Sequence, residues 1–165
     1  MPRRVRIRWM RETDVAAVGR IERAVFGREA WPPSAFGFAH TVFGASRPPR
    51  GHLWIATSRE GEVAGYAGIE LSALGGEADI INLAVGPAHR RRGVGRRLLA
   101  AVSAHCRARR IWLVWLRVRA SNRGARAFYR RCGFRTVGRF RGYYDAPDED
   151  AILMARRIGP SRAVR

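Results

Sequence analysis

One stretch constrains the fold more than any other, because a buried strand, a basic glycine-bearing loop and a helix start follow one another within it. Residues 80–85 form an apolar run with the length and β-branched content of a buried strand. Gly86 and Pro87 end it, since proline donates no ladder hydrogen bond. After three arginines and a Gly-x-Gly, an apolar stripe from Val94 to Cys106 predicts a helix. A loop at a helix N-terminus offers unpaired N–H groups to a phosphate.

The glycine spacing in this loop excludes two common phosphate-binding motifs. A dinucleotide fingerprint would need a third glycine where Leu98 stands. A P-loop would need Gly-Lys-Ser/Thr, which does not follow. The pattern Arg90-x-x-Gly93-x-Gly95, directly after a strand, is therefore a different kind of anion-binding loop, with a solvated basic turn as the alternative.

The rest of the chain predicts an α/β (α+β) fold with a single mixed sheet. The expected order is β-α-α-β-β-β-α-β-α-β-β, which gives about seven strands and about four helices. Thr13 and Ser34 are expected to cap the first two helices, and residues 141–150 to form the loop of the last hairpin. The length suits one domain over residues 1–165, with residues 161–165 as a loose tail.

Several segments, in order, resemble the GNAT superfamily of N-acetyltransferases, and within it the RimI-type enzymes that acetylate ribosomal-protein alanine termini. The loop just described resembles the acetyl-coenzyme A loop of that superfamily. The other matching segments are Ile21-Glu22 with Phe26 and Trp31, residues 77–85, residues 115–122, Phe128-Tyr129-x-x-Cys132-Gly133-Phe134, Tyr143-Tyr144, and residues 149–154.

The resemblance implies acetyl-coenzyme A as cosubstrate, with no metal, and a set of residues that bind it. Leu83 and Val85, with Ala84 between them, would pair their backbones with the pantetheine arm. The pyrophosphate would be held through backbone N–H groups of Arg91, Arg92, Gly93, Val94, Gly95 and Arg96. Asn122 would bond the cofactor from the start of the next helix. A backbone N–H at a bulge near Val85 would stabilise the oxyanion. Tyr129 would protonate the leaving thiolate. The alternatives are a simple helix cap for Asn122 and a core aromatic for Tyr129.

One position departs from the family pattern: Arg117 stands where RimI-type enzymes carry a glutamate base. An arginine cannot accept a proton at neutral pH. Either Asp79 or Glu70 acts as the base through water, with Asp79 ranked first, or Arg117 binds an acidic substrate residue, or the enzyme is slow or inactive on amines. Strand alternation places Arg117 on the face of Trp115, opposite Leu116. A neighbouring carboxylate is expected there, with its pKa depressed by the arginine.

The acceptor implied by the resemblance is the α-amino group of a protein N-terminus, for which a ribosomal protein is one option. Arg117, Tyr143 and Tyr144 are expected to bind this substrate, because aromatic rings can wall a peptide site. Two alternatives stay open. The chain could acetylate a small-molecule amine or a lysine side chain, or it could be a weakly catalytic acetyl-coenzyme A or RNA-binding module.

Composition restricts the compartment and the partners. The net charge is +19, all of its basic residues being arginine, which favours weak nucleic-acid or ribosome association. A GC-rich genome, which favours arginine codons, is the alternative explanation. Cys106 and Cys132 fall in predicted helices, which suggests reduced, buried thiols and a cytoplasmic protein. No Cys/His spacing suggests a metal, and no apolar run suggests a membrane span.

Overall fold

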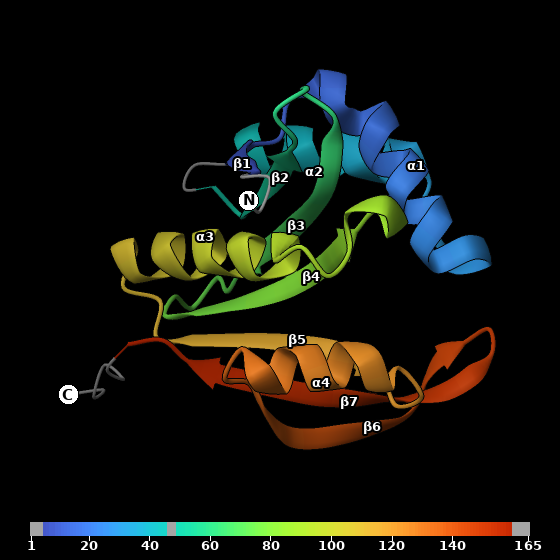
Figure 1. Cartoon of the computed structure of the whole chain (residues 1–165). Coiled ribbons are helices and arrows are strands. Elements are labelled where there is room, and N and C mark those ends of the chain that lie inside the picture. The colour runs from blue at the N-terminus through green and yellow to red at the C-terminus, as the bar shows by residue number, and fades with distance from the viewer. Residues whose placement is uncertain (1–4, 46–48, 160–165) are drawn as a thin grey trace.

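A computed structural model describes residues 5–45 and 49–159, so the expected tail at 161–165 lies outside the described residues. Seven strands form one mixed sheet in the order β1-β2-β3-β4-β5-β7-β6 (Figure 1). The strands are β1 (Arg6–Trp9), β2 (Gly51–Thr57), β3 (Val63–Leu71), β4 (Glu77–Val85), β5 (Leu113–Arg119), β6 (Arg135–Asp145) and β7 (Asp148–Arg157). The predicted fold class and element order are confirmed.

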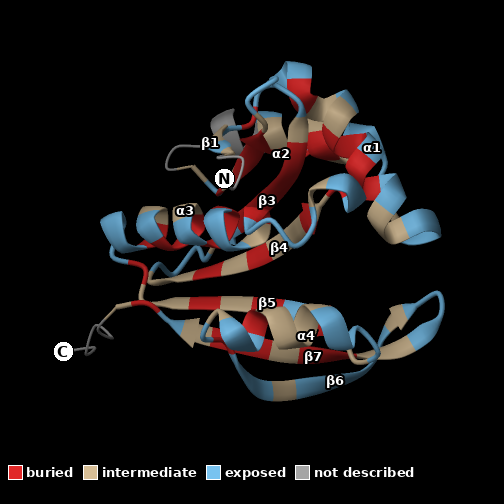
Figure 2. Ribbon diagram, viewed as in Figure 1, coloured by how far each residue is buried: buried red, intermediate tan, exposed pale blue. Residues whose placement is uncertain are grey.

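Four α-helices cover the two faces of this sheet. They are α1 (Val15–Phe26), α2 (Pro33–Ala45), α3 (Val94–Ala108) and α4 (Arg123–Arg131), and short 3-10 turns, η1 (Glu12–Asp14), η2 (Gly27–Glu29) and η3 (Pro87–His89), flank them. The apolar stripes of α1 and α2 pack on β2 and β3 through residues such as Val18, Phe36 and Tyr66. Those of α3 and α4 pack on the opposite face, with Leu98 and Leu116 fully buried (Figure 2). Two cores therefore sandwich the sheet.

The sheet opens between β4 and β5, its only parallel pair of neighbouring strands. Their pairing runs from Glu77 opposite Leu113 to Ile80 opposite Leu116 and ends there. Beyond this point β5 continues on β7, and β4 continues on β3 as far as Val85. Residues 81–85 of β4 consequently have no strand partner on their β5 side within the described chain. This opening is called the split below.

A β-bulge in β4 changes which face its side chains reach. Gly68 pairs with Asn82 and Ile69 with Ile80, which leaves Ile81 as the extra residue. Ala78 and Ile80 pack in the α3 core, but Ala84 packs in the α1 core. Strict alternation would have put all three on one face. The bulge expected near Val85 therefore lies four residues earlier, and it turns Asn82 toward α1.

Four local predictions were wrong, and the first two concern the last hairpin and the start of α2. Tyr143 and Tyr144 are strand residues, since β6 and β7 extend to Asp145 and Asp148 and only Ala146 and Pro147 separate them. Pro33 starts α2, so Ser34 lies inside that helix and does not cap it. Proline suits a first helical position because its missing N–H has no intrahelical partner there.

The cap of α1 and one cysteine also differ from expectation. Asp14, not Thr13, is the N-cap of α1, after the turn η1. Cys132 caps the end of α4 and is only half-buried, whereas Cys106 is buried in α3 as expected. Among the described residues, no helix is long and apolar enough to cross a membrane.

Candidate active site

A cleft of about 500 Å³ occupies the split. β4 and β5 form its floor through residues such as Leu83 and Val118, and α1 closes one side. Asn122 lines it from the start of α4, Tyr129 from the last turn of α4, and Tyr144 from β6. The cleft thus joins residues about 120 positions apart in the sequence, and among its lining are four of the predicted site residues, Leu83, Asn122, Tyr129 and Tyr144.

The predicted anion-binding loop connects the end of β4 to the start of α3. Gly93 is the N-cap of α3 with φ of 79°, a left-handed conformation that glycine adopts without strain, and Arg91 has φ of 60°. Apart from the adjoining residues of its own segment, no atom of the described chain lies within 4 Å of where a Gly93 Cβ would be, so the space beside the loop is open there. The helix start therefore presents free N–H groups to an anion.

Gly95 has a different reason to be glycine. A Cβ there would lie 3.0 Å from the Cζ of Phe128 on α4. The missing side chain lets α3 approach α4 closely, and this contact fixes the loop next to the helix that carries Tyr129.

Asn122 and Tyr129 both take the structural roles given as alternatives, and both also line the cleft, where their predicted roles toward the cosubstrate stay predictions. The Asn122 side chain accepts a hydrogen bond from the Ala125 N–H at 3.0 Å, which makes it the N-cap of α4, and it also lines the cleft. Tyr129 is 8% exposed and packs against Phe128 and Phe134, yet it lines the same cleft. Burial raises the pKa of Tyr129. Its phenol therefore stays protonated and remains a donor at neutral pH.

Glu22, which was not among the predicted site residues, is the most buried carboxylate of the cleft. It is 1% exposed, and its oxygens accept hydrogen bonds from the Tyr66 hydroxyl, from the Trp31 N–H at 3.0 Å and from the Asn82 amide at 3.3 Å. Burial raises its pKa, against the effect of the backbone and amide donors. The signal in the sequence was a charged residue next to the apolar stripe of α1.

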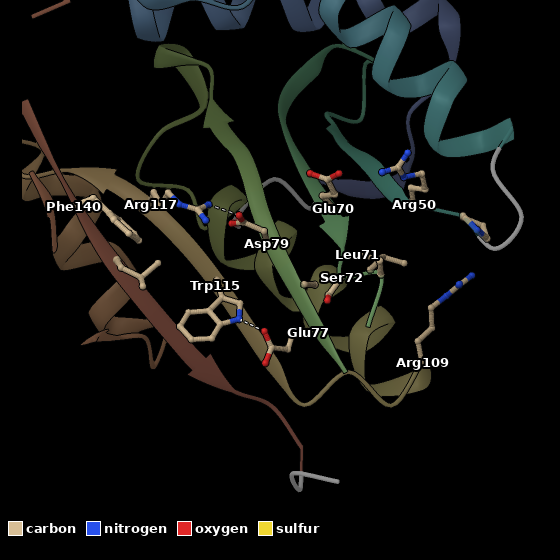
Figure 3. Close-up of a pocket in the computed structure, with 14 residues that line it drawn as sticks. Arg50, Glu70, Leu71, Ser72, Glu77, Asp79, Arg109, Trp115, Arg117 and Phe140 are labelled. Carbon is tan, nitrogen blue, oxygen red and sulfur yellow. Dashed lines mark hydrogen bonds and ion pairs between the residues drawn. The ribbon is translucent and has the colours of Figure 1, made fainter. Parts of the chain in front are cut away.

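A second hollow, of about 910 Å³, lies on the same face of the sheet as α1 and α2, over the part of that face that these helices do not cover (Figure 3). It is called the groove below. Glu70 and Asp79 line it from β3 and β4, and Trp115 and Arg117 from β5. The Trp115 indole donates to Glu77 at 2.9 Å, and Arg117 donates to Asp79. Arg117 also lines the cleft, so the two hollows meet at this arginine.

The carboxylate partner predicted for Arg117 is therefore Asp79, but the predicted direction of its pKa shift was wrong. Burial raises the pKa of Asp79, and the hydrogen bond and charge of Arg117 offset only part of this effect. The other carboxylate oxygen, Oδ1, is buried without a partner among the described residues. A desolvated carboxylate resists ionisation, so Asp79 is a stronger base than an exposed aspartate.

The remaining predicted residues lie around the groove and at the mouth of the cleft. Glu70 is exposed and is the cross-strand neighbour of Asp79. The Arg117 guanidinium lies 5.9 Å from the ring centres of both Phe140 and Tyr143. Tyr143 therefore lies near the Arg117 guanidinium, but it lines neither the cleft nor the groove.

Arg119 was not singled out by the sequence and connects the two sides of the cleft mouth. Its guanidinium bonds Glu29 on η2 at 2.8 Å and Glu149 on β7 at 3.3 Å. It also lies 4.0 Å from the ring centre of Tyr144. The same side chain thus holds the α1–α2 connection against the last hairpin.

Comparison with known proteins agrees with this geometry. A model of the "Acetyltransferase (GNAT) family" matches residues 15–134, which is most of the chain. The chain belongs to the GNAT family. It is therefore an acetyl-coenzyme A-dependent N-acetyltransferase. The loop before α3 and the unpaired edge of β4 fit a ligand with phosphates and an extended arm, as this GNAT cosubstrate has.

The similar relatives are RimI-type GNAT proteins. The chain is 35% identical over 151 residues to the N-alpha-acetyltransferase RimI of Mycobacterium tuberculosis, and the match covers 88% of each chain. It is 33% identical over 148 residues to the [ribosomal protein bS18]-alanine N-acetyltransferase of Escherichia coli K12, covering 88% of this chain and 93% of the relative. The crystal structure of the ribosomal-protein-S18-alanine N-acetyltransferase from Escherichia coli superposes with a TM-score of 0.81, at 29% identity, over 98% and 99% of the two chains.

Proposed function

We propose that this GNAT protein acetylates the α-amino group of a protein N-terminus. The observation that carries the proposal is the continuity of the cleft with the groove at Arg117. A reacting amine in the cleft could thereby continue as a polypeptide along the groove, which a small amine would leave empty. The similarity to RimI-type relatives supports the same acceptor class, because one is named an N-alpha-acetyltransferase and another a ribosomal protein bS18-alanine N-acetyltransferase.

The cosubstrate site is proposed to lie along the split. Leu83, Ala84 and Val85 would pair with the extended arm, because their edge of β4 has no strand partner. The pyrophosphate would be held by N–H groups of Arg91, Arg92, Gly93, Val94, Gly95 and Arg96, and Asn122 would bond the cosubstrate from α4. When bound, the cosubstrate supplies an activated acetyl thioester.

Two side chains are proposed to move the protons. Asp79 accepts the proton of the amine through a water molecule, since its pKa is raised and its Oδ1 has no other partner in the described chain. Tyr129 gives its hydroxyl proton to the sulfur as the carbon–sulfur bond breaks and the carbon–nitrogen bond forms. Glu70, which is exposed, is the less suitable base. Orientation of the amine by the walls of the cleft supplies much of the remaining rate.

Arg117 is proposed to hold Asp79 in position, and Tyr144 to form the aromatic wall of the acceptor path. Tyr143, which lines neither hollow, packs against Tyr144 with 5.0 Å between the ring centres. The alternative in which Arg117 binds an acidic residue of the substrate keeps support, because its side chain is 34% exposed and lines both hollows. The two roles differ in the peptides that the enzyme should prefer.

A peptide panel tests the proposal. Purified enzyme and acetyl-coenzyme A would be incubated with peptides that start with Ala, Ser, Asp or Glu, and the acetylated atom would be located by fragmentation mass spectrometry. Modification of the α-amine is expected. Matched peptides with a blocked N-terminus and an internal lysine should stay unmodified, as should small amines. Acetylation of the blocked peptides or of the small amines alone would overturn the proposal.

A further inference from the structure

Acidic residues are absent from one long part of the chain. Residues 80–144 hold 17 arginines and no aspartate or glutamate, whereas the other 100 residues hold 15 arginines and all 13 acidic residues. Codon bias toward arginine would raise the arginine content everywhere, but it would not remove carboxylates from 65 consecutive residues. The net charge of +19 is therefore concentrated and not spread.

This stretch builds the face of the molecule that α3 and α4 cover (Figure 1). The arginines here that are exposed, on the loop before α3, on α3 and its end, and on α4, are Arg90, Arg91, Arg92, Arg96, Arg97, Arg107, Arg109, Arg110, Arg123, Arg130 and Arg131. None of them forms an ion pair within residues 5–45 and 49–159. The paired arginines of the stretch, Arg117, Arg119 and Arg139, all meet acids on the acceptor side.

The opposite side of the molecule has mixed charge. Glu22, Glu29, Asp79 and Glu149 surround the cleft and the groove there. The two sides therefore differ in kind: the acceptor side carries charges of both signs, whereas the loop 90–92, α3 and α4 carry arginines and no acidic residue. A surface of one sign attracts an oppositely charged polymer over a long range.

The cosubstrate does not account for the full length of this face. Its phosphates would lie at the N-terminus of α3, and α3 has 15 residues, so its other end is about 22 Å away. Arg107, Arg109 and Arg110 lie at that far end and are exposed. The helix dipole favours a cation there but does not explain the absence of acids from both helices. An anion that neutralises both ends of α3 must be long.

We propose that the face formed by the loop 90–92, α3 and α4 binds the phosphate backbone of double-stranded RNA. None of the large apolar side chains that are exposed in the described chain belongs to α3 or α4. The face thus offers no ring on which an unpaired base could stack and no apolar residue to insert into a membrane. The arginines of this face can still contact the phosphates of a nucleic-acid backbone. Duplex RNA is recognised largely by its shape and by contacts to its phosphates and 2′-hydroxyl groups.

The choice of RNA over DNA rests on the proposed function, because the relatives act, by their names, on a ribosomal protein. Such an acceptor would stand beside RNA. Binding through this face leaves most of the groove open, because Glu70, Asp79 and Arg117 line it from the other side of the sheet and, of the exposed arginines named above, only Arg109 also lines it. The enzyme could then hold RNA and an acceptor N-terminus at once.

Fluorescence anisotropy with a labelled 20-base-pair RNA duplex tests the proposal on the full chain. The wild-type affinity should fall steeply between 50 and 200 mM salt. The variant Arg107→Gln/Arg110→Asn should bind at least about tenfold more weakly at low salt, and its salt slope should be smaller by about 2, one for each lost phosphate contact. Arg110→Asn alone should give about half of this change in slope, and it keeps the test valid if Arg107→Gln, which removes a bond to the Ile158 carbonyl, lowers stability.

The control variant is Arg20→Gln/Arg23→Gln on α1, which removes the same charge outside the stretch. It should bind the duplex nearly as well as the wild-type protein, and both double variants should keep peptide acetylation. Equal weakening by the control would mean that net charge alone attracts RNA, and would overturn the proposal. So would complete displacement of the RNA by saturating coenzyme A, or equal or tighter binding to a DNA duplex or to anionic phosphatidylserine vesicles. Loss of acetylation with RNA binding intact would concern the proposed function only.

Discussion

Glu22 and Asp79 are both carboxylates on the α1 side of the sheet, and burial raises the pKa of each. They differ in their neighbours. Glu22 receives three kinds of donor, from Tyr66, Trp31 and Asn82, and is 1% exposed. Among the described residues Asp79 has one side-chain partner, Arg117, and its Oδ1 has no hydrogen-bond partner. The same desolvation therefore acts on a carboxylate that donors saturate, Glu22, and on one that they do not, Asp79, which is the proposed base.

The largest expected effect is on turnover in Asp79→Asn. If Asp79 is the base, kcat/KM for an alanine-starting peptide should fall about 10³-fold, within the usual range for a general base. The measurement is steady-state acetylation with Asp79→Asn and Glu70→Gln side by side. Glu70→Gln should change the rate little.

The same experiment needs a control for the arginine that Asp79→Asn leaves unpaired. The double variant Asp79→Asn/Arg117→Gln removes the pair as a whole. Recovery of activity in the double variant would mean that the stray charge, and not the loss of a base, caused the defect. A large loss in Glu70→Gln with a mild one in Asp79→Asn would reverse the assignment.

The second effect separates the proton donor from both carboxylates. Tyr129→Phe should lower kcat about 10²-fold and leave the affinity for the cosubstrate unchanged. The acid limb of the pH profile should stay in place, because that limb belongs to the base. Wild-type turnover in this variant would reduce Tyr129 to a core aromatic.

The third effect should appear in stability. Glu22→Ala leaves buried donors without an acceptor and opens a cavity, which together should cost about 3 kcal/mol of unfolding free energy. Tyr66→Phe, which removes one donor and leaves the carboxylate, should cost about 1 kcal/mol. Denaturant unfolding at pH 7 measures both values. Equal costs would contradict the structural role of Glu22 as the common acceptor of several donors.

The pH dependence of Glu22 has a defined sign. Its folded pKa is raised, so its contribution to stability is largest below the unfolded pKa of about 4.3 and is lost as the pH rises through the folded pKa. The difference in unfolding free energy between the wild type and Glu22→Ala should therefore be larger at pH 5 than at pH 7. An unchanged difference would mean that the donors cancel the effect of burial.

The smallest effect is expected for Arg117→Gln. The arginine lowers the pKa of Asp79 against the effect of burial, so its removal should raise that pKa further. The acid limb of kcat/KM should move to higher pH, with a few-fold change at neutral pH. If Arg117 instead binds an acidic substrate residue, activity on peptides that start with Asp or Glu should fall selectively while the acid limb stays in place.

The sequence by itself determined the strand, loop and helix around Gly93, because these depend on local chemistry: proline ends a ladder, and glycine adopts a positive φ. It also determined the face of Arg117, since alternation is a property of a regular strand, and Asn122 as the cap of α4. The resemblance of its segments to GNAT proteins supplied the family.

Only the tertiary structure decided the features that depend on long-range contacts. The bulge at Ile81 reverses the phase of β4 and brings Asn82 to Glu22, 60 residues away. Pairing with β7 carries Tyr143 and Tyr144 into a strand. The direction of the Asp79 pKa shift depends on how completely distant elements remove water from it, whereas the sequence revealed only the nearby opposite charge. Burial is a sum over the whole fold, and so no local pattern could have predicted that it outweighs Arg117.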